Sequence, residues 1–225
     1  AMEWYGVDRP DIRYGMKAVD ISELAGKSGF SVFVSNVEAG KPVKCICAPN
    51  ITEGMSKTKL KAFTKELEDM AKDAGAKGLA WMSLPAEEEG QVQGPIGKFF
   101  TVEQKMELFE TMDAGANDLL LFISDTREVC WDVTAALRPY LAEQLGLLDP
   151  NTLAYCWVID FPMFMWNEDE KRWDPSQHMF TMPLPEDADM LEENPGETRG
   201  SQYDMVCNGH EVGGGSIRIH DREYQ

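Results

Sequence analysis

Asp204 and Glu211 flank an Asn208-Gly209 dipeptide in the segment 203–220, between two runs in which apolar and polar residues alternate. Asn-Gly is the strongest short signal for a two-residue hairpin loop, because a type I′ turn needs positive φ at both central residues. Such a hairpin places both carboxylates on one face, with Cβ atoms roughly 6–8 Å apart. Carboxylates that close repel each other unless a cation lies between them, and a hard divalent cation such as Mg²⁺ is the usual one.

The predicted hairpin has a definite register. With Asn208-Gly209 as the loop, the expected cross-strand pairs are Cys207–His210, Val206–Glu211, Met205–Val212 and Asp204–Gly213. Three glycines follow at 213–215, and glycine inside a strand is typical of a bulge or of a closely approaching ligand. We expect a bulge in this glycine run, which would turn Arg218 toward the carboxylates, while Ile217 and Ile219 anchor the strand in the core. On pattern alone, a solvated hairpin with a flexible tip also fits, since short motifs often arise by chance.

Other motifs occur along the chain in a fixed order: YGVDRPDIRYGM at 5–16, GAKGLAW at 75–81, GPIGKFF at 94–100 and WVIDFPMF at 157–164. Together with NG-x-E-x-GGGSIRIH at 208–220, they resemble the bacterial and mitochondrial type of aspartyl-tRNA synthetase, a class II synthetase, over essentially the whole chain. The resemblance implies an internal fragment. Ala1-Met2 matches interior positions of that family, two class II signatures would precede the chain, and a third, ending in arginine, would follow Gln225.

The resemblance also implies roles for individual residues. It places Glu211 at the ATP site, and Asp204 with Glu211 would hold Mg²⁺, which bridges ATP phosphates. Arg218 would grip the aspartate side chain, a task that suits the two parallel hydrogen bonds a guanidinium offers a carboxylate. Residues 176–181 match a mobile loop that closes over the bound amino acid, where the family usually has His-His-Pro-Phe-Thr. His178 matches the second histidine, and Gln177 replaces the first, which contacts aspartate, so the consequence of Gln177 stays open.

The implied function is that of an aspartate–tRNA ligase, an aminoacyl-tRNA ligase that binds aspartate, ATP and tRNA. Aspartate and ATP give aspartyl-adenylate and pyrophosphate, and the aspartyl group then passes to the tRNA 3′ end. We assign no catalytic residue, since positioning and charge neutralisation suffice for the first step, and we expect the isolated chain to be inactive. The parent enzyme is expected to be a cytoplasmic homodimer, and whether it also charges asparagine tRNA stays open. The alternatives are a non-catalytic tRNA-contacting GAD-type module and an amidotransferase subunit that would share only residues 30–123.

An α+β fold in three segments is expected to position these residues. Residues 1–16 are turn-rich and read as a connecting segment of the catalytic domain, and residues 149–225 read as an antiparallel-sheet segment of the class II catalytic core. Residues 17–148 resemble the GAD insertion domain, a mixed sheet with helices that should fold alone and carry no chemistry. Its strands are expected at 30–34, 43–47, 80–82 and 119–123, and its helices at 57–74, 102–113 and 126–146.

Three further elements are expected in the last segment. Residues 155–159 carry apolar side chains on both faces, which favours a strand in the centre of a sheet. Residues 167–174 read as an acidic turn, and 186–193 as a short helix in an acidic loop. The helix after 57 begins with four closely spaced lysines, which are typical of a solvated face.

Composition limits the function classes. The formal net charge is −18, from 39 acidic and 21 basic residues, which argues against a broad nucleic-acid footprint on this chain. The cysteines lack paired zinc-site spacing, so core packing in a reducing compartment is the simpler interpretation; they are Cys45, Cys47, Cys130, Cys156 and Cys207. No apolar run approaches the roughly 18 residues that a membrane helix needs, so no membrane partner is expected.

Overall fold

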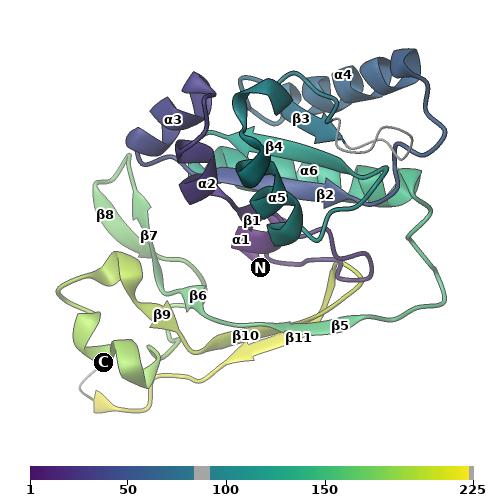
Figure 1. The fold of residues 1–225 in the computed structure, drawn as a ribbon. Coiled ribbons are helices and arrows are strands. Elements are labelled where there is room, and N and C mark those ends of the chain that lie inside the picture. The colour runs from purple at the N-terminus through teal and green to yellow at the C-terminus, as the bar shows by residue number, and fades with distance from the viewer. Residues whose placement is uncertain (84–91, 223–225) are drawn as a thin grey trace. The chain divides into compact units, whose positions relative to one another are not determined.

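The computed structural model describes residues 1–83 and 92–222 of the chain (Figure 1). The chain divides into two units, of which unit 1 comprises residues 1–8 and 13–150 and unit 2 comprises residues 9–12 and 151–225. Both units mix helices with antiparallel sheets, so the predicted α+β class is confirmed.

Unit 1 is built on a four-stranded antiparallel sheet in the order β1-β2-β4-β3. Its strands are β1 (Val19–Asp20), β2 (Val43–Ala48), β3 (Ala80–Ser83) and β4 (Leu119–Ser124). Its helices are α1 (Met2–Tyr5), α2 (Ser22–Gly26), α3 (Ser31–Glu38), α4 (Lys57–Asp73), the 3₁₀ helix η1 (Gly97–Phe99), α5 (Val102–Thr111) and α6 (Arg127–Gln144). The strands expected at 43–47, 80–82 and 119–123 and the helices expected after 57, 102 and 126 are therefore confirmed.

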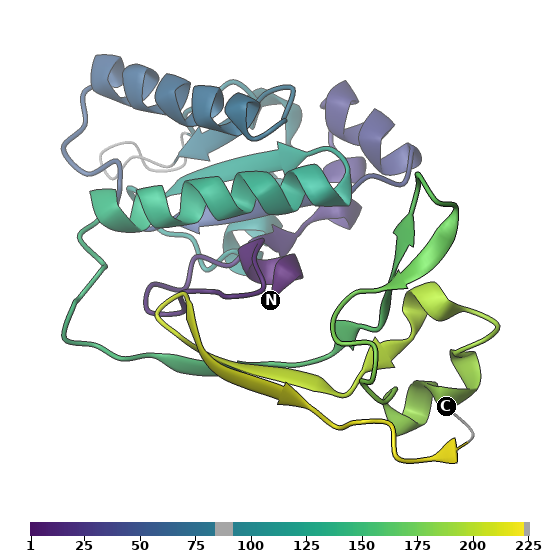
Figure 2. The same ribbon diagram turned by 180° about the vertical axis from the view of Figure 1, so that it is seen from behind.

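Strand β4 separates two hydrophobic cores. Its residues 119, 121 and 123 pack with α4 and α6 on one face, while Leu120 and Phe122 pack with α2, α3 and α5 on the other. Figure 2 shows α4 and α6 covering their face, and Figure 1 shows the opposite layer. Because successive strand side chains point to opposite faces, a strand that is apolar at every position must be covered on both sides.

Helix α3 corrects the strand predicted at 30–34. The run of β-branched residues there favours a strand, but Phe33 is buried and packs on Phe30 at a ring distance of 4.8 Å. Val37 contacts the same core, whereas Val32 is exposed. Phe30, Phe33 and Val37 have helical spacing, so burial of one helical face outweighs the weak intrinsic preference of the intervening residues.

The long helices begin at side-chain caps. Ser56 accepts a hydrogen bond from the amide of Lys59 at the start of α4, and Thr101 forms a capping box with Gln104 at α5. The Thr126 hydroxyl accepts a hydrogen bond from the amide of Val129 at the start of α6. These hydroxyls satisfy backbone N–H groups that have no partner within the helix.

Residues near the start of the chain are tied to α6 by a buried arginine. The Arg138 guanidinium donates to the carbonyls of Gly15 (2.7 Å) and Met16 (3.0 Å). It also lies between the rings of Tyr5 and Tyr14, 4.5 and 4.8 Å from their centroids. A buried guanidinium needs such partners, because an unsatisfied one would lose its hydration without compensation.

Gly6→Ala should destabilise unit 1 by about 3 kcal/mol, the sum of left-handed backbone strain and a forced clash. Gly6 has φ +75°, and a Cβ there would overlap the Trp131 carbonyl oxygen and lie 2.9 Å from the Ala135 nitrogen. Gly54→Ala is the matched control, since Gly54 has φ +66° with nothing within 4 Å. Urea unfolding followed by circular dichroism should show about 1 kcal/mol for that control, and equal losses for both variants would contradict the packing argument.

Unit 2 contains a three-stranded antiparallel sheet in the order β11-β10-β5 and two small two-stranded ladders, β6 with β9 and β7 with β8. Its elements are β5 (Tyr155–Val158), β6 (Phe161–Pro162), β7 (Phe164–Asn167), β8 (Arg172–Pro175), the 3₁₀ helices η2 (Pro185–Met190) and η3 (Pro195–Glu197), β9 (Arg199–Gly200), β10 (Gln202–Cys207) and β11 (His210–Ser216). The acidic turn expected at 167–174 is the hairpin of β7 and β8, and the short helix expected at 186–193 is η2.

Strand β5 was predicted to be central, and that prediction is wrong for the described residues, in which β5 is an edge strand. Val158 and the half-buried Cys156 pack with Val206, but Tyr155 and Trp157 are exposed by 55% and 62%. The Trp157 ring meets only the edge of a neighbouring aromatic, Tyr203, at 5.9 Å. Strand β5 therefore carries apolar residues on both faces, but Tyr155 and Trp157 are not buried within this unit.

Candidate functional site

The hairpin of β10 and β11 turns at the predicted dipeptide. Asn208 and Gly209 have φ values of 51° and 84°, the positive values that a type I′ turn requires. The Asn208 side chain accepts a hydrogen bond from the amide of Ala154 (2.9 Å) and donates to the carbonyl of Thr152 (2.8 Å). The turn is therefore anchored to the start of β5 instead of forming a flexible tip.

The register beyond the turn corrects the sequence prediction. Cys207–His210 and Val206–Glu211 pair as expected, but Met205 pairs with Gly213 and Asp204 with Gly214. Val212 is the additional residue, so the bulge lies before the glycine run and not within it. A bulge inserts one residue and reverses which face the following side chains occupy.

The two predicted carboxylates lie together beside Gly214. A Cβ at Gly214 would overlap Asp204 Oδ1 and would lie 3.3 Å from Glu211 Oε1, so both carboxylates converge over this glycine. Asp204 is buried, with 9% exposure, while the Glu211 side chain is 40% exposed. Gly214 thus leaves room for side chains of the site itself. The expectation that both carboxylates share one face of one hairpin is confirmed.

The donor set around Asp204 and Glu211 suits one kind of metal binding. Among residues 1–83 and 92–222, no group of three or more His, Cys, Asp or Glu side chains could hold a metal ion. Two carboxylates are too few for an all-protein cage, but Mg²⁺ is usually held by one or two carboxylates together with substrate phosphates and water. Residues Asp204 and Glu211 therefore fit a magnesium ion that arrives with a phosphate ligand.

Arg218 lies on a segment that pairs with the predicted amino-acid loop. The amide of Met182 donates to the Ile217 carbonyl (2.8 Å), and the amide of Ile219 donates to the Phe180 carbonyl (2.9 Å). These bonds flank the bridge between Thr181 and Arg218. The segment that contains Gln177 and His178 therefore leads directly into a strand beside Arg218, although the two regions are far apart in sequence.

The side chains of this region are open to solvent. Gln177, His178 and Arg218 are exposed, and His178 Nδ1 accepts a hydrogen bond from the amide of Phe180 at 3.1 Å. Ile217 is 55% exposed, so the expectation that it anchors the strand in a core is wrong. The strand is held by the backbone pairing described above and by the bond from Thr181 Oγ1 to Ser216 Oγ (3.1 Å).

Arg9 is a further residue at this site that the sequence did not single out. Its Nε lies 4.0 Å from Glu211 Oε2, and residues 9–12 belong to the same unit as the hairpin. The two residues are separated by most of the chain, and spacing alone cannot reveal such a contact. Arg9 lies within the motif at 5–16, but that motif alone does not assign Arg9 a role.

The cysteines of unit 1 behave as core residues. Burial, with a smaller contribution from Asp118, raises the pKa of the Cys47 thiol to about 12, and burial also raises the pKa of Cys45. Thiols with raised pKa values stay protonated and are poor nucleophiles and metal ligands. All five cysteines are free of disulfides.

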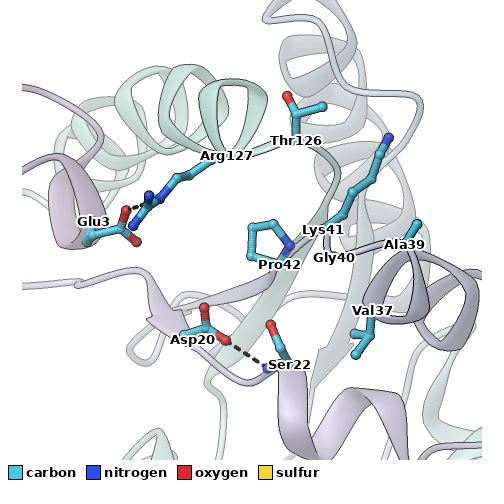
Figure 3. Close-up of a pocket in the computed structure, with 10 residues that line it drawn as sticks. All are labelled: Glu3, Asp20, Ser22, Val37, Ala39, Gly40, Lys41, Pro42, Thr126 and Arg127. Atoms are coloured by element: carbon cyan, nitrogen blue, oxygen red, sulfur yellow. Dashed lines mark hydrogen bonds and ion pairs between the residues drawn. The ribbon is translucent and has the colours of Figure 1, made fainter. Parts of the chain in front are cut away.

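A pocket of about 690 Å³ opens in unit 1 (Figure 3). Its charged lining groups already pair with one another or with neighbours: Arg127 with Glu3 at 2.7 Å, and Lys41 with Asp125 at 2.8 Å. Burial alone would raise the pKa of Glu3, but hydrogen bonds and charges from Lys44 and Arg127 hold it below its usual value. The charged side chains around the pocket therefore form a network of ion pairs. Its lining residues are Glu3, Asp20, Ser22, Val37, Ala39, Gly40, Lys41, Pro42, Thr126 and Arg127.

Residues 33–134 match the GAD domain, so most of unit 1 consists of that domain. Over 221 residues, or 98% of the chain, the sequence is 43% identical to an aspartate–tRNA(Asp/Asn) ligase of Geotalea uraniireducens. Over all 225 residues it is 43% identical to ligases of the same name from Bacillus anthracis and Bacillus cereus. The chain is similar to these aspartate–tRNA ligases along its whole length, as the motifs predicted, and it spans 36% to 37% of the length of these relatives. None of the helices in the described ranges is long and apolar enough to cross a membrane.

Proposed function

We propose that this chain is the part of an aspartate–tRNA ligase that supplies the magnesium–ATP carboxylates and the aspartate-gripping arginine. The observation that carries the proposal is the convergence of Asp204 and Glu211 over Gly214. The neighbouring pairing of the 176–182 segment with the Arg218 strand supports it.

The residues would act mainly by binding and orienting. Glu211 and Asp204 would hold Mg²⁺, which supplies neutralisation of the ATP phosphates and of the departing pyrophosphate. Arg218 would hold the side-chain carboxylate of aspartate by two hydrogen bonds, and Gln177 and His178 would close over the amino acid. Effective alignment of the two reactants supplies much of the rate enhancement in such a step.

The remaining parts of the proposal concern partners and organisation. The whole protein would bind aspartate, ATP and tRNA, act as a homodimer and work in the cytoplasm. Residues 17–148 would fold alone as the GAD-type insertion, while 1–16 and 149–225 would belong to the catalytic core. A non-catalytic module or an amidotransferase subunit is not favoured, because the similarity to ligases extends through the hairpin and not only through the GAD domain.

Aspartate-dependent exchange of labelled pyrophosphate into ATP tests this proposal. The full-length ligase that carries this chain should catalyse the exchange with aspartate and not with asparagine. The 225-residue chain by itself should give no exchange above a heat-treated control. Absence of aspartate-dependent exchange from the full-length protein would contradict the proposed function.

A further inference from the structure

We propose that Arg9 is a phosphate-binding residue that makes the Asp204–Glu211 pair select a metal–phosphate complex over a bare divalent cation. This proposal rests on the proposed function, because it takes the two carboxylates as the magnesium–ATP site. Arg9 lies beside Glu211, with 4.0 Å between Arg9 Nε and Glu211 Oε2.

The backbone holds Arg9 at the hairpin turn. The Arg9 carbonyl oxygen lies 3.8 Å from the position a Gly209 Cβ would occupy, and the Asp11 nitrogen lies 3.9 Å from it. Between them Pro10 is buried, while Arg9 itself is exposed. Proline fixes its own φ and restricts the residue before it to extended conformations, so Arg9 has few backbone states available. A buried proline and a close-packed turn thus direct an exposed guanidinium to the edge of the carboxylate site.

The ion pair by itself contributes little. The Arg9 and Glu211 side chains are 54% and 40% exposed, and water screens exposed pairs strongly. The distance of 4.0 Å is also longer than a charge-assisted hydrogen bond. A bound anion that accepts two hydrogen bonds would therefore be a stronger partner for the guanidinium than Glu211 is.

The charges explain the selection. A bare Mg²⁺ ion on Asp204 and Glu211 would neutralise the carboxylates and leave two cations, the metal and Arg9, close together. A metal ion bound to ATP brings negatively charged oxygens that accept hydrogen bonds from the guanidinium, so the repulsion becomes an attraction. Arg9 should therefore weaken binding of the metal alone and strengthen binding of the metal–phosphate complex.

Two titrations on the full-length ligase test the inference, one with Mn²⁺ alone and one with ATP in excess Mg²⁺. Arg9→Gln should raise the Kd for ATP by about tenfold, while Mn²⁺ alone binds at least as tightly as to the unaltered enzyme. Arg9→Lys keeps the charge and should stay within about threefold of the unaltered enzyme for ATP. Arg172→Gln is the matched control, because it removes another exposed, ion-paired arginine of unit 2.

The outcomes separate three cases. Unchanged ATP affinity in Arg9→Gln, or equal weakening of ATP and Mn²⁺, would overturn the inference, and so would Arg9→Lys behaving like Arg9→Gln. An unaltered enzyme that binds no ATP would instead overturn the proposed function. Matching thermal midpoints for all variants would show that the changes in affinity do not come from unfolding.

Discussion

Arg218→Lys in the full-length ligase should lower kcat/KM for aspartate by about 100- to 1,000-fold, while KM for ATP changes by less than about threefold. Lysine keeps one positive charge but loses the planar fork that holds a carboxylate through two parallel hydrogen bonds. The Arg218 side chain is exposed, so it is accessible to the carboxylate of a bound aspartate.

The geometry of β11 supports this role. Because the bulge at Val212 precedes the glycines, Gly214, Ser216 and Arg218 have the same parity along the strand. Gly214 faces the two carboxylates, and Arg218 lies two residues beyond Ser216, where β11 ends. A site built around this charge should also reject asparagine by roughly 10⁴-fold, since asparagine leaves the guanidinium uncompensated.

Steady-state pyrophosphate exchange at varied aspartate and varied ATP measures the effect of Arg218→Lys. Arg172→Lys is the matched control, because Arg172 pairs with Glu170 and Asp174 on the hairpin of β7 and β8. An equal loss for aspartate and ATP would show that Arg218 has a structural role. Unchanged aspartate dependence would show that another residue selects the amino acid.

Glu211→Gln should slow adenylate formation by about 100-fold with little change in KM for aspartate, because it removes half of the carboxylate pair that we propose to hold the metal. The amide keeps the size of the side chain and the bulge in β11 but provides no negative charge. Higher Mg²⁺ concentrations should restore part of the rate, since the loss lies in metal affinity.

Rapid-quench measurement of adenylate in a single turnover separates the loss in Glu211→Gln from product release. Glu168→Gln serves as the control, because Glu168 is an exposed glutamate of the same unit that pairs with the nearby Lys171. A large rise in KM for aspartate, or no response to added Mg²⁺, would contradict metal binding by Glu211.

Local signals in the sequence were reliable where burial and pattern agreed. The Asn208-Gly209 turn needs positive φ at both residues, and strand β4 is apolar on both faces, so in each case only one structure fits the sequence. In α3, by contrast, the intrinsic preference of valines for strands was opposed by the helical spacing of Phe30 and Phe33, and packing decided the outcome.

The errors within the site come from non-local geometry. The shift of the bulge from the glycine run to Val212 changes the partner of Asp204, and a one-residue shift of this kind depends on how β10 and β11 twist together. The contact of Arg9 with Glu211 joins distant parts of the chain. Sequence spacing predicts residues that share one element, but not residues that two separate elements bring together.

The hydrogen bond from Arg13 Nη1 to the carbonyl of Asp149, at 2.9 Å, joins residues 136 positions apart. These residues stand where the chain enters unit 1 from residues 9–12 and where it leaves for residues 151–225. A block whose two ends are neighbours can be added to a gene, or removed from it, without stretching the polypeptide on either side. The stretch from residue 13 to residue 150, which contains the residues that match the GAD domain, therefore has neighbouring ends, the geometry that an inserted block requires.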